Sequence, residues 1–176
     1  MKARYYQAIR LASTTDLGRE AWLKIRAQGI GSSDAAVAVG LSPYKSPLSL
    51  WLEKTNRKPA VDLSEKEAVI WGTVLEPVLA KVYAARTGRR VRRVNAVLQH
   101  PDPDKHFMLA NLDYSVVGSN EVQILECKTA GEYGAKLWRD GVPLYVLCQV
   151  QHQLAMTGKR AAHVCVLICG HETKIF

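Results

Sequence analysis

The pattern with the most chemical content lies in the segment 121–128, Glu-Val-Gln-Ile-Leu-Glu-Cys-Lys. Side chains alternate between the two faces of a β-strand, so the even-numbered residues, apolar at first, share one face that ends in Glu126 and Lys128. Two positions on one face lie about 6.6 Å apart between α-carbons, so both charged groups can reach a single phosphate. A Glu-x-Lys triplet is nevertheless common, and alone it more often marks an ion pair at the protein surface.

A second acid, Asp113, lies in the preceding predicted strand. A hairpin between the two strands would bring the carboxylates of Asp113 and Glu126 side by side. Like charges that close need a cation between them. A hard divalent ion with oxygen ligands, magnesium by default, meets that need. The alternative is that Asp113 lies in a turn while Glu126 pairs with Lys128 at the surface.

A third acid, Glu76, lies in a predicted helix. Its neighbours at three and four residues are Gly72, Thr73, Leu79 and Ala80, which do not resemble a solvated helix face. Glu76 is therefore predicted to border the packed side of its helix and to contribute to the same site. The alternative is that its carboxylate caps a turn of its own helix beside Pro77.

A site of a different kind is predicted at Ser33, which stands at the start of a short helix. The free backbone N–H groups of a helix start attract anions. The alternative is a plain N-cap, which needs no ligand.

The elements that must position these residues follow from hydrophobic period and turn residues. Helices are predicted from Thr15 or Asp16 to Gly29, from Gly31 to Gly40, and from Pro47 to about Thr55. A capping box of Ser64 and Glu67 predicts a longer helix that ends at Gly88, kinks at Pro77 and packs through Trp71, Leu75, Val78, Leu79 and Val82. Three strands follow, at 91–98, 107–117 and 121–128, then a short helix within 131–141, a helix at 144–156 and a strand at 161–168.

This order predicts an α+β fold: N-terminal helices, a central mixed sheet that contains an antiparallel meander, a helix on the sheet and a further strand. The length of 176 residues, with 48% hydrophobic residues, predicts a single domain over residues 1–176.

The chain is basic, with 24 Lys and Arg against 16 Asp and Glu and a formal net charge of +8. Such a charge favours a polyanionic partner, although it does not specify one. The densest cluster comprises Arg86, Arg89, Arg90, Arg92 and Arg93. It predicts either a contact with nucleic acid or a solvated face that complements the end of a helix.

Several classes of protein are disfavoured. Apolar runs such as 164–169 are far shorter than the roughly 18–20 residues of a membrane span, and residues 1–11 lack the apolar region of a signal peptide. The four cysteines and five histidines lack the spacing of zinc ligands. A cytoplasmic protein without a membrane partner is predicted.

Five blocks of sequence together resemble the YqaJ-like viral recombinase family, which includes lambda exonuclease and belongs to the PD-(D/E)xK nuclease superfamily. The resemblance extends over about residues 17–170, in the family's order and spacing. The blocks are residues 31–36 (Gly-Ser-Ser-Asp-Ala-Ala), 71–77 (Trp-Gly-Thr-Val-Leu-Glu-Pro), the segment around Asp113, 126–129 (Glu-Cys-Lys-Thr) and 149–154 (Gln-Val-Gln-His-Gln-Leu).

The resemblance implies a restriction-endonuclease-like core and a metal site. Asp113, Glu126 and the backbone carbonyl of Cys127 would ligate Mg²⁺, for which Mn²⁺ is expected to substitute. Glu76 would serve a second metal ion or its water. Lys128 would orient the attacking water and help to deprotonate it.

Three more residues match functional positions of the family: Gln149 would line the site, and Arg26 and Ser33 would bind the 5′-phosphate of the strand being digested. Two features depart from the family pattern. Leu112 replaces the proline that gives the superfamily its name, which affects the local turn. The chain also stops at Phe176, whereas relatives usually continue into at least one more helix, so C-terminal elements are expected to be missing.

The implied function is a 5′→3′ exonuclease on ends of linear double-stranded DNA, which leaves a 3′ single strand for a phage single-strand annealing protein. The resemblance also implies a homotrimer, and a phage or prophage protein that acts inside a bacterial host. Two alternatives stay open: an endonuclease of the same fold, and a non-catalytic DNA-binding recombination module.

Overall fold

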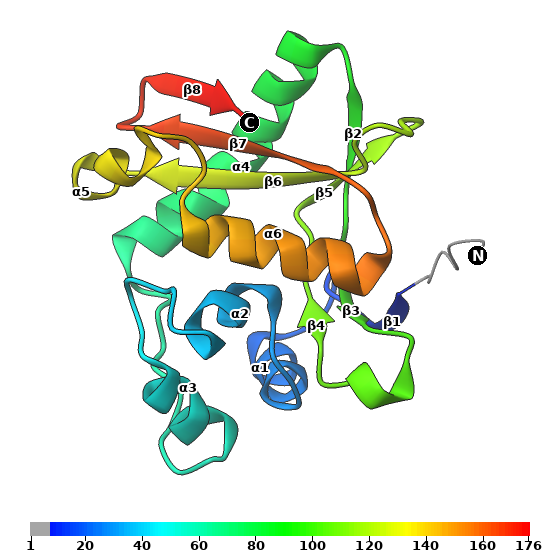
Figure 1. Cartoon of the computed structure of the whole chain (residues 1–176), viewed down its shortest axis with the longest axis vertical. Helices are drawn as coiled ribbons and strands as arrows, with labels where there is room; N and C mark the ends of the chain where they lie inside the picture. The colour runs from blue at the N-terminus through cyan, green and yellow to red at the C-terminus, as the bar shows by residue number, and fades with distance from the viewer. Residues whose placement is uncertain (1–7) are drawn as a thin grey trace. The chain divides into compact units, whose positions relative to one another are not determined.

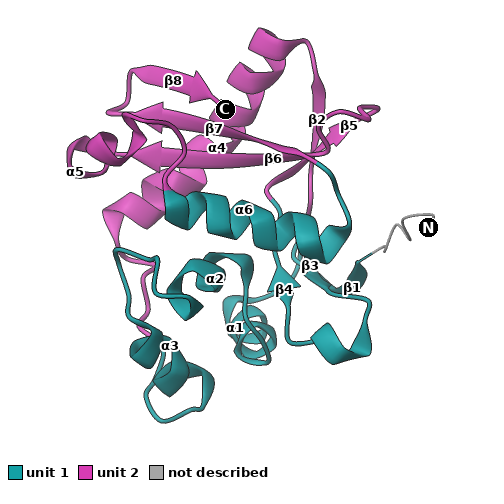
Figure 2. Ribbon diagram, in the orientation of Figure 1, with its two compact units in different colours: residues 1–60, 95–112, 144–160 teal, residues 61–94, 113–143, 161–176 magenta. Residues whose placement is uncertain are grey.

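The computed structural model describes residues 8–176 (Figure 1). Residues 1–7, part of the stretch assessed above for a signal peptide, lie outside the described residues. Contacts divide the chain into two compact units, each assembled from three separate segments (Figure 2). Unit 1 comprises residues up to 60, 95–112 and 144–160, and unit 2 comprises residues 61–94, 113–143 and 161–176.

Unit 2 is built on a five-stranded mixed sheet, which confirms the predicted α+β fold. Its strands, in spatial order, are β2 (Arg90–Arg93), β5 (Tyr114–Val117), β6 (Ile124–Ala130), β7 (Ala162–Ile168) and β8 (Glu172–Ile175). The first three pair antiparallel, which is the predicted meander. β6 and β7 pair parallel, and β8 returns antiparallel to β7. Unit 2 also contains α5 (Glu132–Ala135) and the 3-10 helix η2 (Lys136–Trp138).

The long helix α4 (Glu67–Thr87) packs against β6 and β7 of this sheet (Figure 1). Its buried residues are Leu79, Ala80 and Tyr83, which join Leu125 and Cys165 in the core of unit 2. The predicted apolar face is therefore partly wrong, since Trp71 and Val78 are exposed. The packed face is set by which side of the helix meets the sheet, and the hydrophobic period alone cannot show that.

The predicted capping box at the start of α4 is also wrong. The helix is preceded by Lys66, without a side-chain cap. Ser64 instead bonds locally, since its backbone N–H and its hydroxyl both donate to Asp62 Oδ1. A short polar side chain that finds such a neighbour is no longer available to cap a helix.

One helix of the described part, α4, is long and apolar enough to cross a membrane by length and composition, with a hydropathy of 1.3. Core helices of water-soluble proteins pass the same test. Only 17% of the apolar stretch of α4 is buried. This helix therefore exposes more apolar surface than the short apolar runs of the sequence suggested.

The described part of unit 1 combines four α-helices with a small sheet. The helices are α1 (Arg19–Ala27), α2 (Ser32–Ala38), α3 (Pro47–Lys54) and α6 (Leu144–Thr157), close to the predicted bounds. The sheet has the order β1 (Ile9–Ser13), β3 (Ala96–Gln99) and β4 (Leu109–Ala110), and the 3-10 helix η1 (Pro103–Lys105) lies between its last two strands in the chain. α2 packs against both α3 and α6.

Two of the predicted strands, 91–98 and 107–117, are each broken in the middle. The segment 91–98 forms β2 in the five-stranded sheet and β3 in the small sheet. The segment 107–117 forms β4 in the small sheet and β5 in the five-stranded sheet. Near the break, the Asn111 side chain donates to the Ala96 carbonyl at 3.0 Å, and the Val94 N–H donates to the Asp113 carbonyl at 2.9 Å. Asp113 consequently stands just before β5.

Candidate active site

β6 holds Glu126 and Lys128 in the arrangement predicted from the alternation of side chains. Lys128 Nζ lies 2.7 Å from Glu126 Oε1. The Glu126 side chain is only 2% exposed and that of Lys128 is 25% exposed. The alternative of an ordinary surface ion pair is therefore wrong. A carboxylate is expensive to bury and needs partners that favour its charged form.

Asp113 lies opposite Glu126, as the predicted hairpin requires. Tyr114 pairs with Leu125, and this register brings Asp113, just before β5, beside Glu126 of β6. Asp113 Oδ2 accepts a hydrogen bond from the Cys127 N–H at 2.8 Å. Burial and the neighbouring Glu126 carboxylate raise the pKa of Asp113 well above its usual value, although the Lys128 ammonium opposes this. The site thus contains two carboxylates that repel each other.

Glu76 projects from α4 into the same electrostatic environment. Its side chain is 18% exposed, and its Oε1 lies 3.3 Å from Arg93 Nη2. Burial raises the pKa of Glu76, with a further rise from Glu126, while Arg93 and Lys128 act in the opposite direction. Oε1 is buried and accepts no hydrogen bond from the described residues. The charges of Glu76, Asp113, Glu126 and Lys128 therefore all interact within unit 2.

Lys128 is held in its charged form. Burial alone would lower its pKa, but the Glu126 and Asp113 carboxylates outweigh burial and raise it. The thiol of the intervening Cys127 remains neutral, because burial and the Asp113 charge raise its pKa. The site thus presents an ammonium and oxygen donors.

The donor set fits a hard divalent cation. Glu76, Asp113 and Glu126 offer only carboxylate oxygens, the ligands that Mg²⁺ prefers. One of these oxygens is buried without a hydrogen bond, and the repulsion around Asp113 would be relieved by a cation. Within residues 8–176, no three Asp, Glu, His or Cys side chains lie in a ready-made ligand cluster. Glu126 faces Lys128 and Asp113 faces the Cys127 N–H, so these side chains would have to turn towards an ion.

The structure brings together the two residues predicted to bind a 5′-phosphate, Arg26 and Ser33. Arg26 Nη2 donates to Ser33 Oγ at 3.0 Å. The guanidinium also lies over the Trp22 ring, 4.8 Å from its centroid. Both contacts restrict a long side chain, so a cation and a hydroxyl are preset side by side on unit 1.

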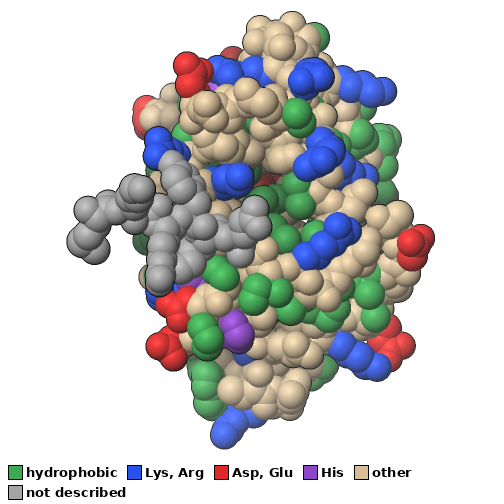
Figure 3. Space-filling model, turned by 90° about the vertical axis from the view of Figure 1, so that its right-hand side faces the viewer, with side chains coloured by type: hydrophobic (Ala, Val, Ile, Leu, Met, Phe, Trp, Pro, Cys, Tyr) green, Lys and Arg blue, Asp and Glu red, His purple; other side chains and the backbone are tan. Residues whose placement is uncertain are grey.

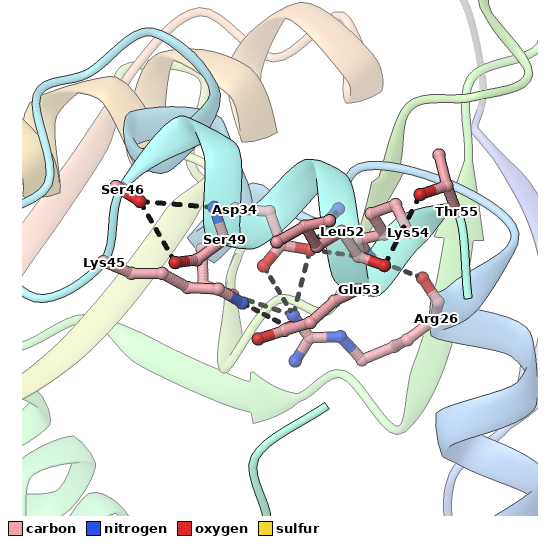
Figure 4. Close-up of polar contacts among 11 residues, drawn as sticks. Arg26, Asp34, Lys45, Ser46, Ser49, Leu52, Glu53, Lys54 and Thr55 are labelled. Atoms are coloured by element: carbon pink, nitrogen blue, oxygen red, sulfur yellow. Dashed lines mark hydrogen bonds and ion pairs between the residues drawn. The ribbon is translucent and has the colours of Figure 1, made fainter. Parts of the chain in front are cut away.

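Asp34 and Lys54 complete this cluster and were not identified from the sequence (Figure 4). Asp34 Oδ2 lies 2.9 Å from Lys54 Nζ and 3.4 Å from Arg26 Nη2, and it accepts a hydrogen bond from the Gly31 N–H at 3.2 Å. Lys54 also donates to the Arg26 carbonyl at 2.7 Å. Asp34 follows Ser33 in the sequence, which was the available signal, whereas nothing local pointed to Lys54.

Gln149 lies on α6, where it is partly buried. It belongs to unit 1 with Arg26 and Ser33, whereas the acids and Lys128 belong to unit 2. Its predicted role in lining the site stays a prediction.

The cluster of five arginines is divided by the structure. Arg86 donates to the Thr173 carbonyl, and Arg89 contacts Ser119 and Glu121. Arg90 and Arg92 are exposed on β2, and Arg93 reaches Glu76. The space-filling view shows several Lys and Arg side chains on the upper part of one face of the molecule (Figure 3). Contact of this cluster with nucleic acid and its alternative, a solvated face, both stay predictions.

Comparison with known structures supports the fold. The alkaline exonuclease LHK-Exo from Laribacter hongkongensis superimposes with a TM-score of 0.69, at 20% identity over 89% of this chain and 80% of that one. The same enzyme in complex with dAMP gives a TM-score of 0.70 at 21% identity, with the same coverage. The sheet of unit 2 thus belongs to a restriction-endonuclease-like fold.

Comparison of sequences adds the family. An uncharacterized protein, YqaJ of Bacillus subtilis (strain 168), is 43% identical over 165 residues, which make up 92% of this chain and 50% of that protein. The chain therefore spans about half the length of this curated relative. The family model for the YqaJ-like viral recombinase domain matches residues 21–160. Because that match covers most of the chain, this protein belongs to the YqaJ-like viral recombinase domain family.

Proposed function

We propose that this protein is a metal-dependent nuclease that digests linear double-stranded DNA in the 5′→3′ direction and prepares a 3′ single strand for recombination. The observation that carries the proposal is the cluster of charges in unit 2, where Asp113 and Glu76 interact electrostatically with Glu126 and Lys128. The family and the fold support the same activity, because viral recombinase domains and an alkaline exonuclease share them.

The carboxylates of Glu76, Asp113 and Glu126, together with the Cys127 carbonyl, would hold Mg²⁺, or Mn²⁺ in its place. A bound divalent ion supplies hydroxide near neutral pH and stabilises the charge that develops on a phosphate under attack. The antiparallel register of β5 and β6 holds Asp113 and Glu126, and the packing of α4 on the sheet supplies Glu76.

Lys128 would act as an ammonium. Its raised pKa keeps it protonated, so it donates hydrogen bonds to a phosphate oxygen and orients the attacking water. It is a poor acceptor for the proton of that water while both carboxylates keep their charge. Stabilisation of the developing charge by a positioned cation is the larger part of its proposed role.

The direction of digestion is proposed from the Arg26 and Ser33 cluster. A guanidinium and a hydroxyl 3.0 Å apart suit a terminal phosphate, which accepts several hydrogen bonds at once. We expect wild-type protein to digest a 5′-phosphorylated duplex faster than the same duplex with a 5′-hydroxyl. Arg26→Ala should digest both at similar rates, as followed by gel electrophoresis.

Lys24→Ala is the matched control for Arg26→Ala. Lys24 lies on the same helix, and its exposed side chain pairs only with Glu20 among the described residues. This variant should keep the preference for 5′-phosphate. An Arg26→Ala protein with the wild-type preference would show that the phosphate binds elsewhere.

Substrate topology separates an exonuclease from an endonuclease of the same fold. With Mg²⁺, we expect linear duplex to be degraded to completion while covalently closed plasmid stays intact, because a closed circle has no end for the phosphate site. Linearised plasmid is the control. Cleavage of closed circles at the rate of linear duplex would favour the endonuclease, and an inactive wild-type protein would favour the non-catalytic binding module.

The proposed partners are ends of double-stranded DNA, a phage single-strand annealing protein and further copies of this chain in a homotrimer. The proposed location is the cytoplasm of a bacterial host. These assignments rest on the family to which the chain belongs.

A further inference from the structure

Arg93 is the arginine of the basic cluster that reaches the candidate active site. It is the last residue of β2, an edge strand of the five-stranded sheet, and pairs with Tyr114 of β5. The N–H of the next residue, Val94, donates to the Asp113 carbonyl at 2.9 Å. The backbone at Arg93 is thereby fixed beside Asp113.

The guanidinium of Arg93 forms an ion pair with Glu76 but no hydrogen bond. Nη2 lies 3.3 Å from Glu76 Oε1, yet Oε1 accepts no hydrogen bond from any described residue. The Arg93 side chain is 52% exposed. The contact is therefore an ion pair that a competing cation can displace, with one end open to solvent.

We propose that Arg93 is a phosphate-binding residue of this active site, and that Glu76 holds it in place until a divalent cation takes over the Glu76 carboxylate. The inference rests on the proposed nuclease function. A planar guanidinium can donate two parallel hydrogen bonds to a phosphate. Arg93 and the cation would compete for Glu76 in the free protein and would act on the same phosphate in the complex.

This competition predicts that Arg93→Gln raises the affinity for Mn²⁺ but lowers kcat/KM. Without DNA, the variant should bind Mn²⁺ about three- to tenfold more tightly, because a nearby positive charge has been removed. With Mg²⁺, its kcat/KM on linear duplex should fall about tenfold or more, because a charge-assisted hydrogen bond to phosphate is lost. Mn²⁺ affinity is measured by titration calorimetry and kcat/KM by release of acid-soluble nucleotide.

Arg92→Gln is the matched control. It removes the same charge from the neighbouring position of β2, whose side chain points to the opposite face of the strand. It should leave Mn²⁺ affinity near the wild-type value and lower kcat/KM much less. Arg93→Lys should keep wild-type Mn²⁺ affinity and digest more slowly than wild type, because an ammonium cannot form the two-pronged contact.

Weakened Mn²⁺ binding in Arg93→Gln, unchanged Mn²⁺ binding, or an equal loss of kcat/KM in Arg92→Gln would overturn the inference. A wild-type protein that binds Mn²⁺ but digests no DNA would instead refute the nuclease function. The calorimetric comparison of Arg93→Gln with Arg92→Gln would still decide whether Arg93 and the cation compete for Glu76.

Discussion

Replacing Lys128 by alanine is expected to reduce the digestion of linear duplex DNA by about 10²–10³-fold, the loss typical when one positioned donor for a developing negative charge is removed. Lys128 lies 2.7 Å from Glu126 and its pKa is raised by the surrounding carboxylates, so it is an ammonium placed among the proposed metal ligands. The measurement is the initial rate of digestion in Mg²⁺ at saturating substrate.

Lys174→Ala is the control, because Lys174 pairs with Glu172 two residues away on β8 of the same sheet, but both of these side chains are exposed. This variant should digest DNA at nearly the wild-type rate. Undiminished activity of Lys128→Ala would show that the chemistry has been assigned to the wrong residue.

Loss of Lys128 has a second effect that must be separated from catalysis. Glu126 is 2% exposed, and a buried charge that loses its partner costs about 3–5 kcal/mol of stability. The double variant Glu126→Gln with Lys128→Met removes both charges and should recover most of that stability while remaining inactive. Thermal unfolding followed by circular dichroism distinguishes an inactive folded protein from an unfolded one.

Replacing Asp113 by asparagine is expected to abolish digestion and yet to stabilise the protein in EDTA. Burial and the Glu126 charge raise the pKa of Asp113, so its ionised form destabilises the folded state near neutral pH. Asparagine removes that charge and can still accept the hydrogen bond from the Cys127 N–H. One pKa unit corresponds to about 1.4 kcal/mol, and 1 kcal/mol raises the Tm of a domain of this size by about 2–4 °C.

The pH dependence of the free energy of unfolding tests the effect of Asp113 on stability independently. A carboxyl group with a raised pKa in the folded state binds more protons there than in the unfolded chain. In EDTA, the free energy of unfolding of the wild type should therefore decrease as the pH rises from the ordinary Asp pKa through the raised one. Asp113→Asn should show a smaller decrease, which comes from the raised pKa of Glu76.

Divalent cations should make the wild type more stable than Asp113→Asn, the reverse of their order in EDTA. Adding Mn²⁺ should raise the Tm of the wild type, because an ion that binds only the folded state stabilises it, and should have little effect on Asp113→Asn. The exposed Asp140, replaced by asparagine, is the control and should behave as the wild type. A lower Tm for Asp113→Asn in EDTA would contradict the described electrostatics of the site.

The centre of the site could be predicted because its geometry is local. Alternation along β6 sets the relation of Glu126 to Lys128, and a hairpin of neighbouring strands sets that of Asp113 to Glu126. The break between β2 and β3 could not be predicted, because it depends on contacts between residues far apart in the sequence, such as Asn111 with Ala96.

The contacts of individual Arg and Lys side chains could not be predicted either. The sequence showed five clustered arginines, but the reach of Arg93 towards Glu76 depends on the register of β2 with β5. The contact of Lys54 with Asp34 joins α3 to α2 through tertiary packing. Sequence period carries no information on such pairings, so Lys54 was missed and Arg93 was seen only as part of a basic cluster.

The most direct test of a metal-centred active site is the anomalous difference map of a crystal soaked in Mn²⁺. We expect a peak within coordination distance of carboxylate oxygens from Asp113 and Glu126, with Glu76 contacting that ion or a second one nearby. A protein that digests DNA but whose Mn²⁺ lies away from these three residues would contradict the proposed site.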